Sequence, residues 1–285
     1  MTARAHFSEV ISFYEPHQHH HALIALRGVD AGLSALSYDA CCLWCLGYPE
    51  QALKRSQEAL SLARELDHAF SLADVLTYGG CVFSEMRLDG QALKDNAEQL
   101  ARLSNERGVT GWLAAATCFS GEGLAMLGRV HEGIAQMRVG MAAEQSQYIR
   151  CHSPASHCSL AMAQAKSGHP EQGLRTLAEA LALVEERDDR YWEAELRRLQ
   201  AELLLTQGGD VEAEASLRKA IEVARRQQAK SWELRAAMSL SRLWQQQDRQ
   251  SEARQLLAEV YNWFSEGFDT ADLQEAKALL EKLGV

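Results

Sequence analysis

One kind of residue returns along this chain at a nearly constant interval, and that interval constrains the fold more than any other feature. A small residue follows a short polar turn in six segments, at steps of 40, 41, 40, 40 and 40 positions. The six residues are Ala52, Ala92, Gly133, Gly173, Ala213 and Ala253. Twelve positions before each stands a second small residue. A repeat of this length indicates a stacked array of similar units rather than one globular core.

The spacing of the small residues predicts a helical hairpin. Two helices approach closely only where side chains are small, so two small positions twelve apart mark a helix crossing. Five positions before each small residue, four of the six repeats have glycine, which takes the left-handed conformation that ends many helices. One hairpin leaves an apolar face uncovered until a neighbour stacks on it. We therefore expect an all-α fold, a right-handed α-solenoid of helix-turn-helix repeats with a period of about 40 residues.

The same pattern gives boundaries for a single domain over residues 1–285. We expect an incomplete repeat or N-terminal helix within 1–30, six repeats over about 31–267 and a capping helix over about 269–284. First helices are expected near 33–46, 70–87, 110–127, 153–167, 190–207 and 230–247. Second helices are expected near 49–66, 90–106, 130–147, 170–186, 210–227 and 250–266. A terminal cap needs a polar outer face, and the last helix supplies Asp272, Glu275, Lys277, Glu281 and Lys282 for it.

Charge and composition argue against several classes of protein. The net charge of −10 disfavours non-specific binding to nucleic acid, which depends on Lys and Arg. No apolar run approaches the roughly 20 residues that a membrane helix needs. The first fifteen residues lack the basic and apolar segments of a secretory signal, and the seven cysteines do not have the spacing of a disulfide scaffold. We expect a cytoplasmic protein with reduced cysteines that binds neither nucleic acid nor membrane.

The spacing of small residues resembles the tetratricopeptide repeat (TPR), whose usual period is about 34 residues. The segments Tyr191–Leu205, Gln228–Trp244, Glu266–Leu283 and Leu46–Ala73 are more specifically similar to the C-terminal TPR region of large bacterial signalling proteins. In those proteins a class III adenylate/guanylate cyclase or a transcription-regulator module precedes an AAA/STAND-type ATPase. The resemblance implies a non-catalytic region for signal transduction that binds proteins, including the ATPase or cyclase domains of the same system. No G-x-x-x-x-G-K-[ST] segment is present, so the ATPase chemistry is not carried over.

The resemblance also implies where a partner would bind. In TPR arrays, ligand-facing positions lie on the first helix of each repeat, at −6, −3, +1 and +4 from its small residue. In the fifth and sixth repeats these positions include Glu195, Arg198, Glu202, Arg235, Arg242 and Gln245. In the first four repeats they are mostly small or apolar, and they include Trp44 and Asp74. The charged set could hold a peptide by charge-assisted hydrogen bonds, and the alternative is that it only solvates or packs the inner wall.

Two other functions remain open at this level. Related arrays in ATPase-linked regulators bind small inducers, so a ligand-sensing domain is the first alternative, favoured by a compact pocket with convergent polar groups. The second is a metal-binding protein, because His17, His19, His20 and His21 form a cluster of imidazoles after Pro16. A structural zinc site usually has four fixed ligands, so we interpret this run as a solvated linker.

Cysteine spacing gives weaker signals. Cys42 and Cys45 have the C-x-x-C spacing of redox and zinc sites, but they fall inside an apolar helix, where core packing explains them better. The pairs Cys151-His152 and His157-Cys158 flank a repeat junction, which accounts for them without a metal. We expect no catalytic residue, no cofactor and no resident metal. A homodimer is a candidate assembly, because the exposed apolar ends of an array can pair.

Overall fold

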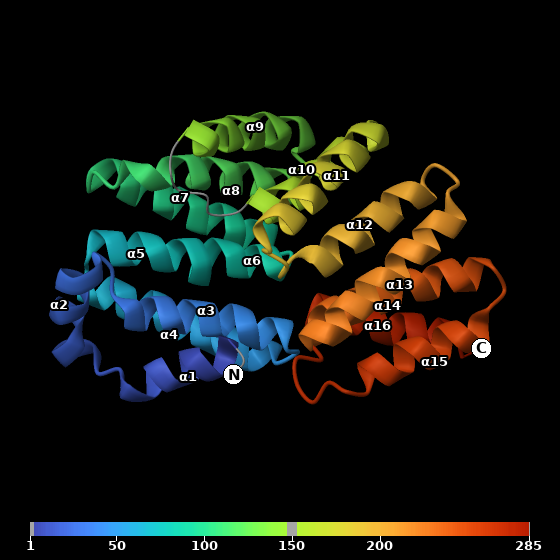
Figure 1. The fold of residues 1–285 in the computed structure, drawn as a ribbon, viewed down its shortest axis with the longest axis horizontal. Helices are drawn as coiled ribbons and strands as arrows, with labels where there is room; N and C mark the ends of the chain where they lie inside the picture. Colours follow the sequence, from blue (N-terminus) through green and yellow to red (C-terminus); the bar gives the residue numbers. More distant parts are fainter. Residues whose placement is uncertain (1–2, 147–152, 285) are drawn as a thin grey trace. The chain divides into compact units, whose positions relative to one another are not determined.

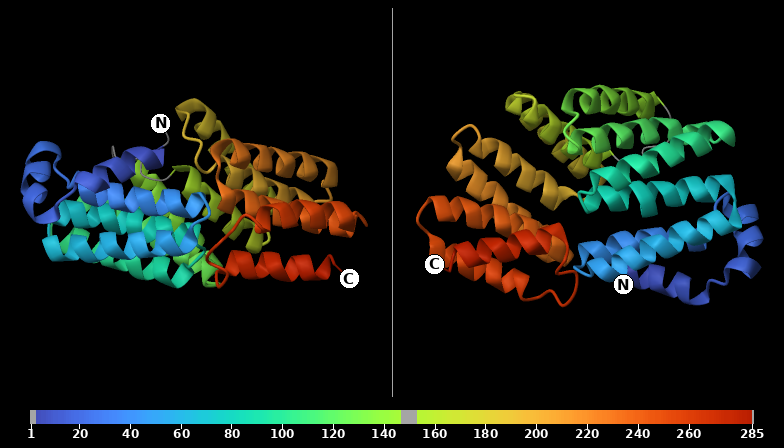
Figure 2. Two further views of the ribbon diagram at one scale, coloured as in Figure 1. Left: turned by 90° about the horizontal axis from the view of Figure 1, so that it is seen from below. Right: turned by 180° about the vertical axis from the view of Figure 1, so that it is seen from behind.

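The computed structural model describes residues 3–146 and 153–284, and within these ranges the chain forms helices and no strand. The all-α fold expected from the repeat is confirmed (Figure 1). The chain divides into two compact units, of which unit 1 is Met1–Trp44 with Gln51–His152 and unit 2 is Cys45–Glu50 with Ser153–Val285. In each unit, antiparallel helical hairpins stack on one another (Figure 2). The single continuous domain stays a prediction.

Unit 1 holds two N-terminal helices and the first three hairpins. Its elements are α1 (Ala3–Phe13), α2 (Pro16–Arg27), α3 (Ala31–Cys45), α4 (Pro49–Leu66), α5 (Ala69–Val75), η1 (Leu76–Val82), α6 (Phe83–Met86), α7 (Gly90–Glu106), η2 (Thr110–Trp112), α8 (Leu113–Met126) and α9 (Val130–Ser146). Unit 2 holds the last three hairpins and the final helix. Its elements are α10 (Ser153–Lys166), α11 (Pro170–Arg187), α12 (Glu193–Leu205), α13 (Asp210–Gln227), α14 (Lys230–Gln246), α15 (Gln250–Tyr261) and α16 (Ala271–Lys282). Most boundaries agree closely with the expected ones, but α15 ends at Tyr261 rather than near residue 266.

The hairpins cross where the sequence has its paired small residues. In the third hairpin, a Cβ atom placed on Gly133 would lie 2.5 Å from the carbonyl oxygen of Gly121, twelve residues earlier. In the sixth hairpin the hydroxyl of Ser241 donates to the carbonyl oxygen of Ala253 over 3.0 Å, again twelve residues apart. Side chains larger than these would hold the helix backbones apart, so the small residues set the distance between the two layers of helices.

The second repeat departs from the register that the sequence suggests. Leu93 is fully buried at the position that Ala52 occupies in the first repeat, whereas Ala92 is only half-buried. Its partner twelve residues earlier is Cys81, which is also fully buried. Counted from Ala52, the buried residues of the second helices therefore follow at a step of 41 to Leu93 and at steps of 40 from there to Ala253. The single extra residue lies before the second hairpin crossing and not after it.

A π-helical turn accommodates this extra residue. The first helix of the second hairpin is continuous from α5 to α6, and η1 in its middle has π-helical geometry. A π-turn adds one residue to an α-helix without breaking it. Before η1, Asp74 lies 40 positions after Ser34 and accepts a hydrogen bond from its hydroxyl at 2.6 Å. By the end of η1 the equivalent positions are 41 apart, as for Ala40 and Cys81, both fully buried.

The corrected register also explains how the first helices end. The residue five positions before each buried small or apolar position of the second helix has a positive φ in all six hairpins. These residues are Gly47, Leu88, Gly128, Gly168, Gly208 and Asp248. Glycine takes this conformation without strain, but leucine and aspartate do so at a cost. The predicted glycine is therefore present at this turn in four hairpins, and in the other two the fold imposes the same backbone conformation on Leu88 and Asp248.

The N-terminal region contains two helices where one was expected. The histidine run 17–21 lies in α2, so the interpretation of this run as a linker was wrong. Proline at the first position of the helix is compatible with helix initiation, which accounts for the start at Pro16. The carboxylate of Asp30 then holds this segment on the array, because it accepts the hydroxyl of Tyr14 and contacts Nδ1 of His20, each at 2.7 Å.

No helix in the described ranges is long and apolar enough to cross a membrane.

Candidate functional site

Three first helices of unit 2 present one continuous face. Helix α12 packs against α14, and α14 packs against α16, so residues at equivalent positions on these helices become neighbours. Their buried sides contribute to a single apolar core that includes Ala201, Leu240 and Leu273. The polar side chains that project from the same helices are consequently held by rigid elements rather than by loops.

The polar side chains on this face form one network and one separate ion pair, Arg242 with Glu275, and we call the whole set the charge ladder. It comprises Glu195, Arg198 and Glu202 on α12, Arg235, Ser239 and Arg242 on α14, and Asp272 and Glu275 on α16.

Within the ladder, contacts run both along a helix and across to the next one. The guanidinium of Arg198 donates to Glu195 at 2.7 and 2.8 Å and also pairs with Glu202. Arg235 lies 3.9 Å from Glu195 on one side and donates to Asp272 at 2.9 Å on the other. Ion pairs that cross from helix to helix fix the relative position of neighbouring repeats.

Burial divides the ladder into a fixed end and an open end. The side chains of Glu195 and Arg235 are each 4% exposed, so their charges are held by protein partners and not by water. Arg242 and Glu275 pair at 2.6 Å, but their side chains are 37% and 61% exposed. An exposed pair contributes about 0 to 1 kcal/mol, whereas breaking a buried pair leaves an uncompensated charge and costs about 3 to 5 kcal/mol. Only the exposed pair at the open end, Arg242 with Glu275, can exchange its partners at a small cost in free energy.

The pKa values at the fixed end show how strongly the charges are held. Burial by itself would raise the pKa of the Glu195 carboxyl, but Arg198 and Arg235 outweigh it and hold this pKa below the ordinary value. Burial opposes the charge on Arg198 as well, yet Glu195 and Glu202 beside it raise the pKa of its guanidinium above the ordinary range. Glu195 and Arg198 are therefore both charged at neutral pH.

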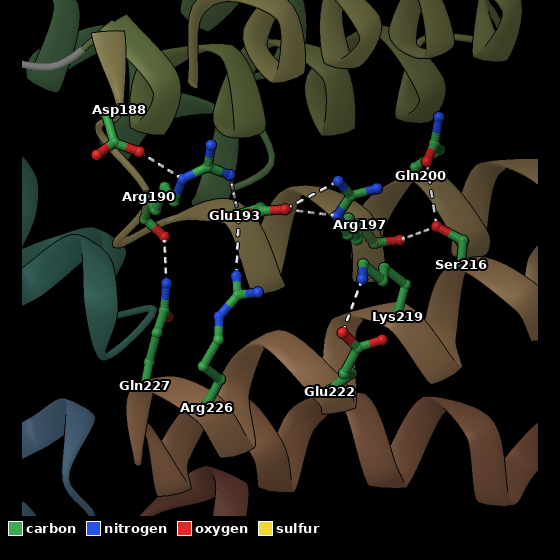
Figure 3. A network of polar contacts seen from close by, with 10 residues as sticks. All are labelled: Asp188, Arg190, Glu193, Arg197, Gln200, Ser216, Lys219, Glu222, Arg226 and Gln227. Atoms are coloured by element: carbon green, nitrogen blue, oxygen red, sulfur yellow. Dashed lines mark hydrogen bonds and ion pairs between the residues drawn. The ribbon is translucent and has the colours of Figure 1, made fainter. Parts of the chain in front are cut away.

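A second network in unit 2 serves the joints between repeats (Figure 3). Glu193 is buried at the start of α12 and accepts from Arg197 at 2.8 Å and from Arg190 at 3.2 Å, with Arg226 at 3.9 Å. Forty residues later, Glu233 is buried in the first turn of α14 and pairs with Arg225 and Lys230, each at 2.7 Å. A carboxylate in the first turn of a helix also interacts favourably with the helix dipole.

This joint network also includes hydrogen bonds to backbone carbonyl groups. The side-chain amide of Gln227 donates to the carbonyl oxygen of Arg190 at 2.7 Å, and the hydroxyl of Ser216 donates to that of Arg197 at 2.9 Å (Figure 3). Burial would raise the pKa of Glu193, but the hydrogen bonds from Arg197 and Arg190 outweigh it and keep this pKa below its usual value. A buried carboxylate held by several cations is suited to stability rather than to exchange with a partner.

The predicted site residues fall into two groups. Glu195, Arg198, Glu202 and Arg235 are linked by contacts in the charge ladder, and Arg242 belongs to it through its separate pair with Glu275. The other three do not join these contacts. Gln245 lies half-buried three residues after Arg242 on α14, and Trp44 and Asp74 belong to unit 1. Trp44 is buried at the end of α3, and burial raises the pKa of the Asp74 carboxyl, which Ser34 partly offsets.

Sequence reasoning missed the contribution of the last helix to the ladder. Asp272 and Glu275 were assigned to the outer surface of a cap, but they face α14 and pair with its arginines. The repeat itself carries the signal, because Glu275 lies 40 positions after Arg235 and Arg235 lies 40 after Glu195. Helix α16 thus occupies the position that the first helix of a seventh repeat would have. Ser239, which donates to Glu202 at 3.0 Å, gave no such signal.

The cysteines do not assemble a metal or redox centre in the described part of the chain. No three His, Cys, Asp or Glu side chains within residues 3–146 and 153–284 converge on a position that could hold a metal ion. Burial, with a further contribution from Asp39, raises the pKa of the Cys42 thiol to about 11, which suppresses the reactive thiolate. The proposed grouping of Cys151 and His152 lies outside the described residues.

The stacked helical hairpins place this chain in the class of TPR-like helical repeat proteins. Three segments of the chain, 34–85, 141–192 and 190–247, match the family model described as anaphase-promoting complex subunit 5. Together they cover more than half of the chain, and the chain belongs to this repeat family. The third segment includes α12, α13 and α14, and with them most of the charge ladder. No curated protein matches the chain.

Proposed function

We propose that this protein is a non-catalytic scaffold that binds a segment of a partner protein along the charge ladder of unit 2. The main supporting observation is that five of the predicted charges lie on the adjacent helices α12 and α14, four of them linked by ion pairs and the fifth, Arg242, in an exposed pair with Glu275. Membership in a family of helical repeats, whose model is named for a subunit of a multiprotein complex, supports the same function. Rigid helices that present fixed charges can recognise a peptide with little loss of conformational entropy.

The open end of the ladder indicates how a segment could be bound. A carboxylate of the partner can replace Glu275 on Arg242, and a basic side chain can then pair with the released Glu275. The exchange conserves the number of ion pairs, so the net affinity comes from orientation and from the neighbouring contacts rather than from the charge alone. The fixed end, with Glu195 and Arg235, keeps α12 and α14 in place during the exchange.

A charge reversal at the open end tests this proposal without unfolding the chain. Arg242→Glu removes one exposed pair, whereas Arg198→Glu would place a carboxylate among Glu195 and Glu202 and destabilise unit 2. Partners of the full-length chain should be identified by crosslinking and mass spectrometry, and their affinity then measured with purified components. We expect Arg242→Glu to weaken binding about tenfold or more, because the new carboxylate repels the carboxylate of the partner instead of pairing with it.

The double variant Arg242→Glu/Glu275→Arg is the matched control. It keeps the pair within the chain but reverses its direction, so a partner that reads the charges should bind it as poorly as the single variant. Crosslinks that avoid α14 and α16, together with equal affinity for all three proteins, would count against the ladder as the binding surface.

A finer proposal rests on the sequence resemblance. We infer that the scaffold belongs to a bacterial cyclase/ATPase signalling system in the cytoplasm and that the ATPase or cyclase domains are among its partners, with a homodimer as a further assembly. Support comes from segments such as Tyr191–Leu205 and Gln228–Trp244, which lie on α12 and α14. Purified ATPase and cyclase domains that fail to bind the wild-type chain, while another protein binds the ladder, would refute this finer proposal alone.

A further inference from the structure

The helical conformation of residues 17–21 sorts the four histidines by direction. His20 is buried against the array, while His17, His19 and His21 are exposed. His17 and His21 are four residues apart on α2, so their side chains project from the same face one turn apart. At about 100° per residue, His19 points roughly 200° away from His17. Its Nδ1 accepts the backbone N–H of Glu15 at 3.0 Å, which also separates it from the other two.

A carboxylate from another helix lies beside this pair. Glu65 is near the end of α4, and its Oε1 is 3.5 Å from Nε2 of His17. Two ligand atoms that each lie about 2.0 to 2.1 Å from a tetrahedral metal ion are roughly 3.4 Å apart. The nitrogen and the oxygen already have the separation of two ligands of one ion. Their side chains are 73% and 62% exposed, so small rotations meet no packing.

The buried contacts of α2 hold its outer face toward α4. Nδ1 of His20 contacts Asp30 at 2.7 Å, and the ring of His20 packs edge-on against that of His68, 6.0 Å between centroids. His68 follows Glu65 by three residues, so α2 lies alongside the end of α4 over about one turn. The direction in which His17 and His21 project is therefore fixed by groups that do not themselves bind the ion.

We propose that His17, His21 and Glu65 form a binding site for a divalent transition-metal ion, with Zn²⁺ as the expected occupant. Two imidazoles and one carboxylate are ligands that zinc prefers, and water can complete a tetrahedral set. The described residues contain no three such side chains already converged, so the ring of His21 must rotate toward His17. The exposed ring of His21 lies edge-on to that of His20, with 5.4 Å between centroids, so the rotation gives up this one ring contact.

A bound ion would connect α2 to α4 and thereby fasten the N-terminal helices to the first hairpin. An ion that binds the folded state and not the unfolded one stabilises the fold in proportion to the logarithm of its concentration above Kd. The site is distant in sequence from the charge ladder and belongs to unit 1, so it does not depend on the proposed scaffold function.

Calorimetric titration of the full chain with Zn²⁺ tests the proposal, with His17→Ala and His21→Ala as test variants and His19→Ala as the matched control. We expect one ion per chain at this site and affinity losses of about tenfold or more for both test variants, as loss of a metal ligand produces. His19→Ala should bind within about twofold of wild type, because its ring points elsewhere. Zinc bound by cysteine thiols would contribute equally to the titrations of all these proteins, so it does not affect the difference between a variant and wild type.

Equal losses in His19→Ala and His17→Ala would mean that the run holds an adventitious ion only, and they would overturn the proposal, as would unchanged binding in both test variants. Glu65→Gln keeps the size of the side chain and removes its charge. A severalfold loss of affinity would support the third ligand, and no loss would overturn its assignment. Zinc should also raise the melting temperature of wild type but not of His17→Ala, and an equal rise in both would count against the link between α2 and α4.

Discussion

Replacing Gly133 by alanine tests the close approach of the helices directly. In an exposed helix this substitution would stabilise by about 1 kcal/mol, because alanine has the higher helix propensity. At Gly133 the added Cβ would lie 2.5 Å from the carbonyl oxygen of Gly121 and 2.8 Å from both the amide nitrogen and Cβ of Ala125. Backbone atoms cannot rotate aside as a long side chain can, so α8 and α9 must separate.

The expected magnitude follows from these two opposing effects. Overpacking in a well-filled core costs about 1 to 3 kcal/mol, and contact with backbone puts Gly133→Ala at the upper end. After the gain in helix propensity, we expect a net loss of about 2 kcal/mol in the free energy of unfolding. Urea denaturation followed by far-ultraviolet circular dichroism measures this loss. Hydrogen exchange of the amides in α8 and α9 would show whether it is local, since repeat arrays often open in parts.

Ala142→Gly is the control, because Ala142 lies exposed on the same helix. It should lose about 1 kcal/mol through helix propensity alone. The sign of the change in the free energy of unfolding at Gly133 distinguishes a close helix crossing from an ordinary exposed helix position. A Gly133→Ala protein as stable as wild type, or more stable, would show that no close crossing exists there and would refute small residues as the basis of the array.

Three further predictions concern single residues. Leu88→Gly should stabilise by about 0.5 kcal/mol, since relief of a positive φ of 56° exceeds the entropy that glycine adds to the unfolded chain, and thermal unfolding measures it. The pKa of Glu193 is lowered in the folded state, so its contribution to stability is present above its ordinary pKa of 4.5 and is lost as pH falls through the lower folded value. Urea titrations between pH 3 and 6 should therefore show that the free energy of unfolding depends less steeply on pH in Glu193→Gln than in wild type. Cys42, with its pKa raised to about 11, should be alkylated at pH 8 about a hundredfold more slowly in the folded than in the unfolded chain, measured by mass spectrometry, and equal rates would contradict the burial of its thiol.

The architecture could be predicted from the sequence because its cause is local and repeated. Small residues twelve apart mark the crossing in five of the six hairpins, and each pair supplies the same information about a crossing. The extra residue of the second repeat could be counted from the sequence but not located. Gly80 and Ala92 continue the small-residue pattern better than Cys81 and Leu93 do, and only packing shows that Leu93, rather than Ala92, is the fully buried residue of the second helix.

The candidate site could be predicted in part, because the same repeat period places its charges. Periodicity places Glu195 and Arg235 on one face, but it does not show which charges pair or how deeply they are buried. Asp272 was misplaced because a terminal helix was assumed to have only an outward polar face. The histidine run was misread because Pro16 suggested a break, although proline at a first helical position is compatible with a helix.

The alternation of charge along the ladder restricts which helices can be neighbours at this end of the array. Equivalent positions 195, 235 and 275 carry Glu, Arg and Glu, so each carboxylate has a guanidinium as its neighbour. Loss of one forty-residue unit by recombination would bring Glu195 beside Asp272 and Glu275. Like charges about 4 Å apart repel by roughly 1 to 4 kcal/mol between water and a protein surface. The signs of these charges therefore match the present order of α12, α14 and α16, in which a helix with arginines lies between two helices with carboxylates.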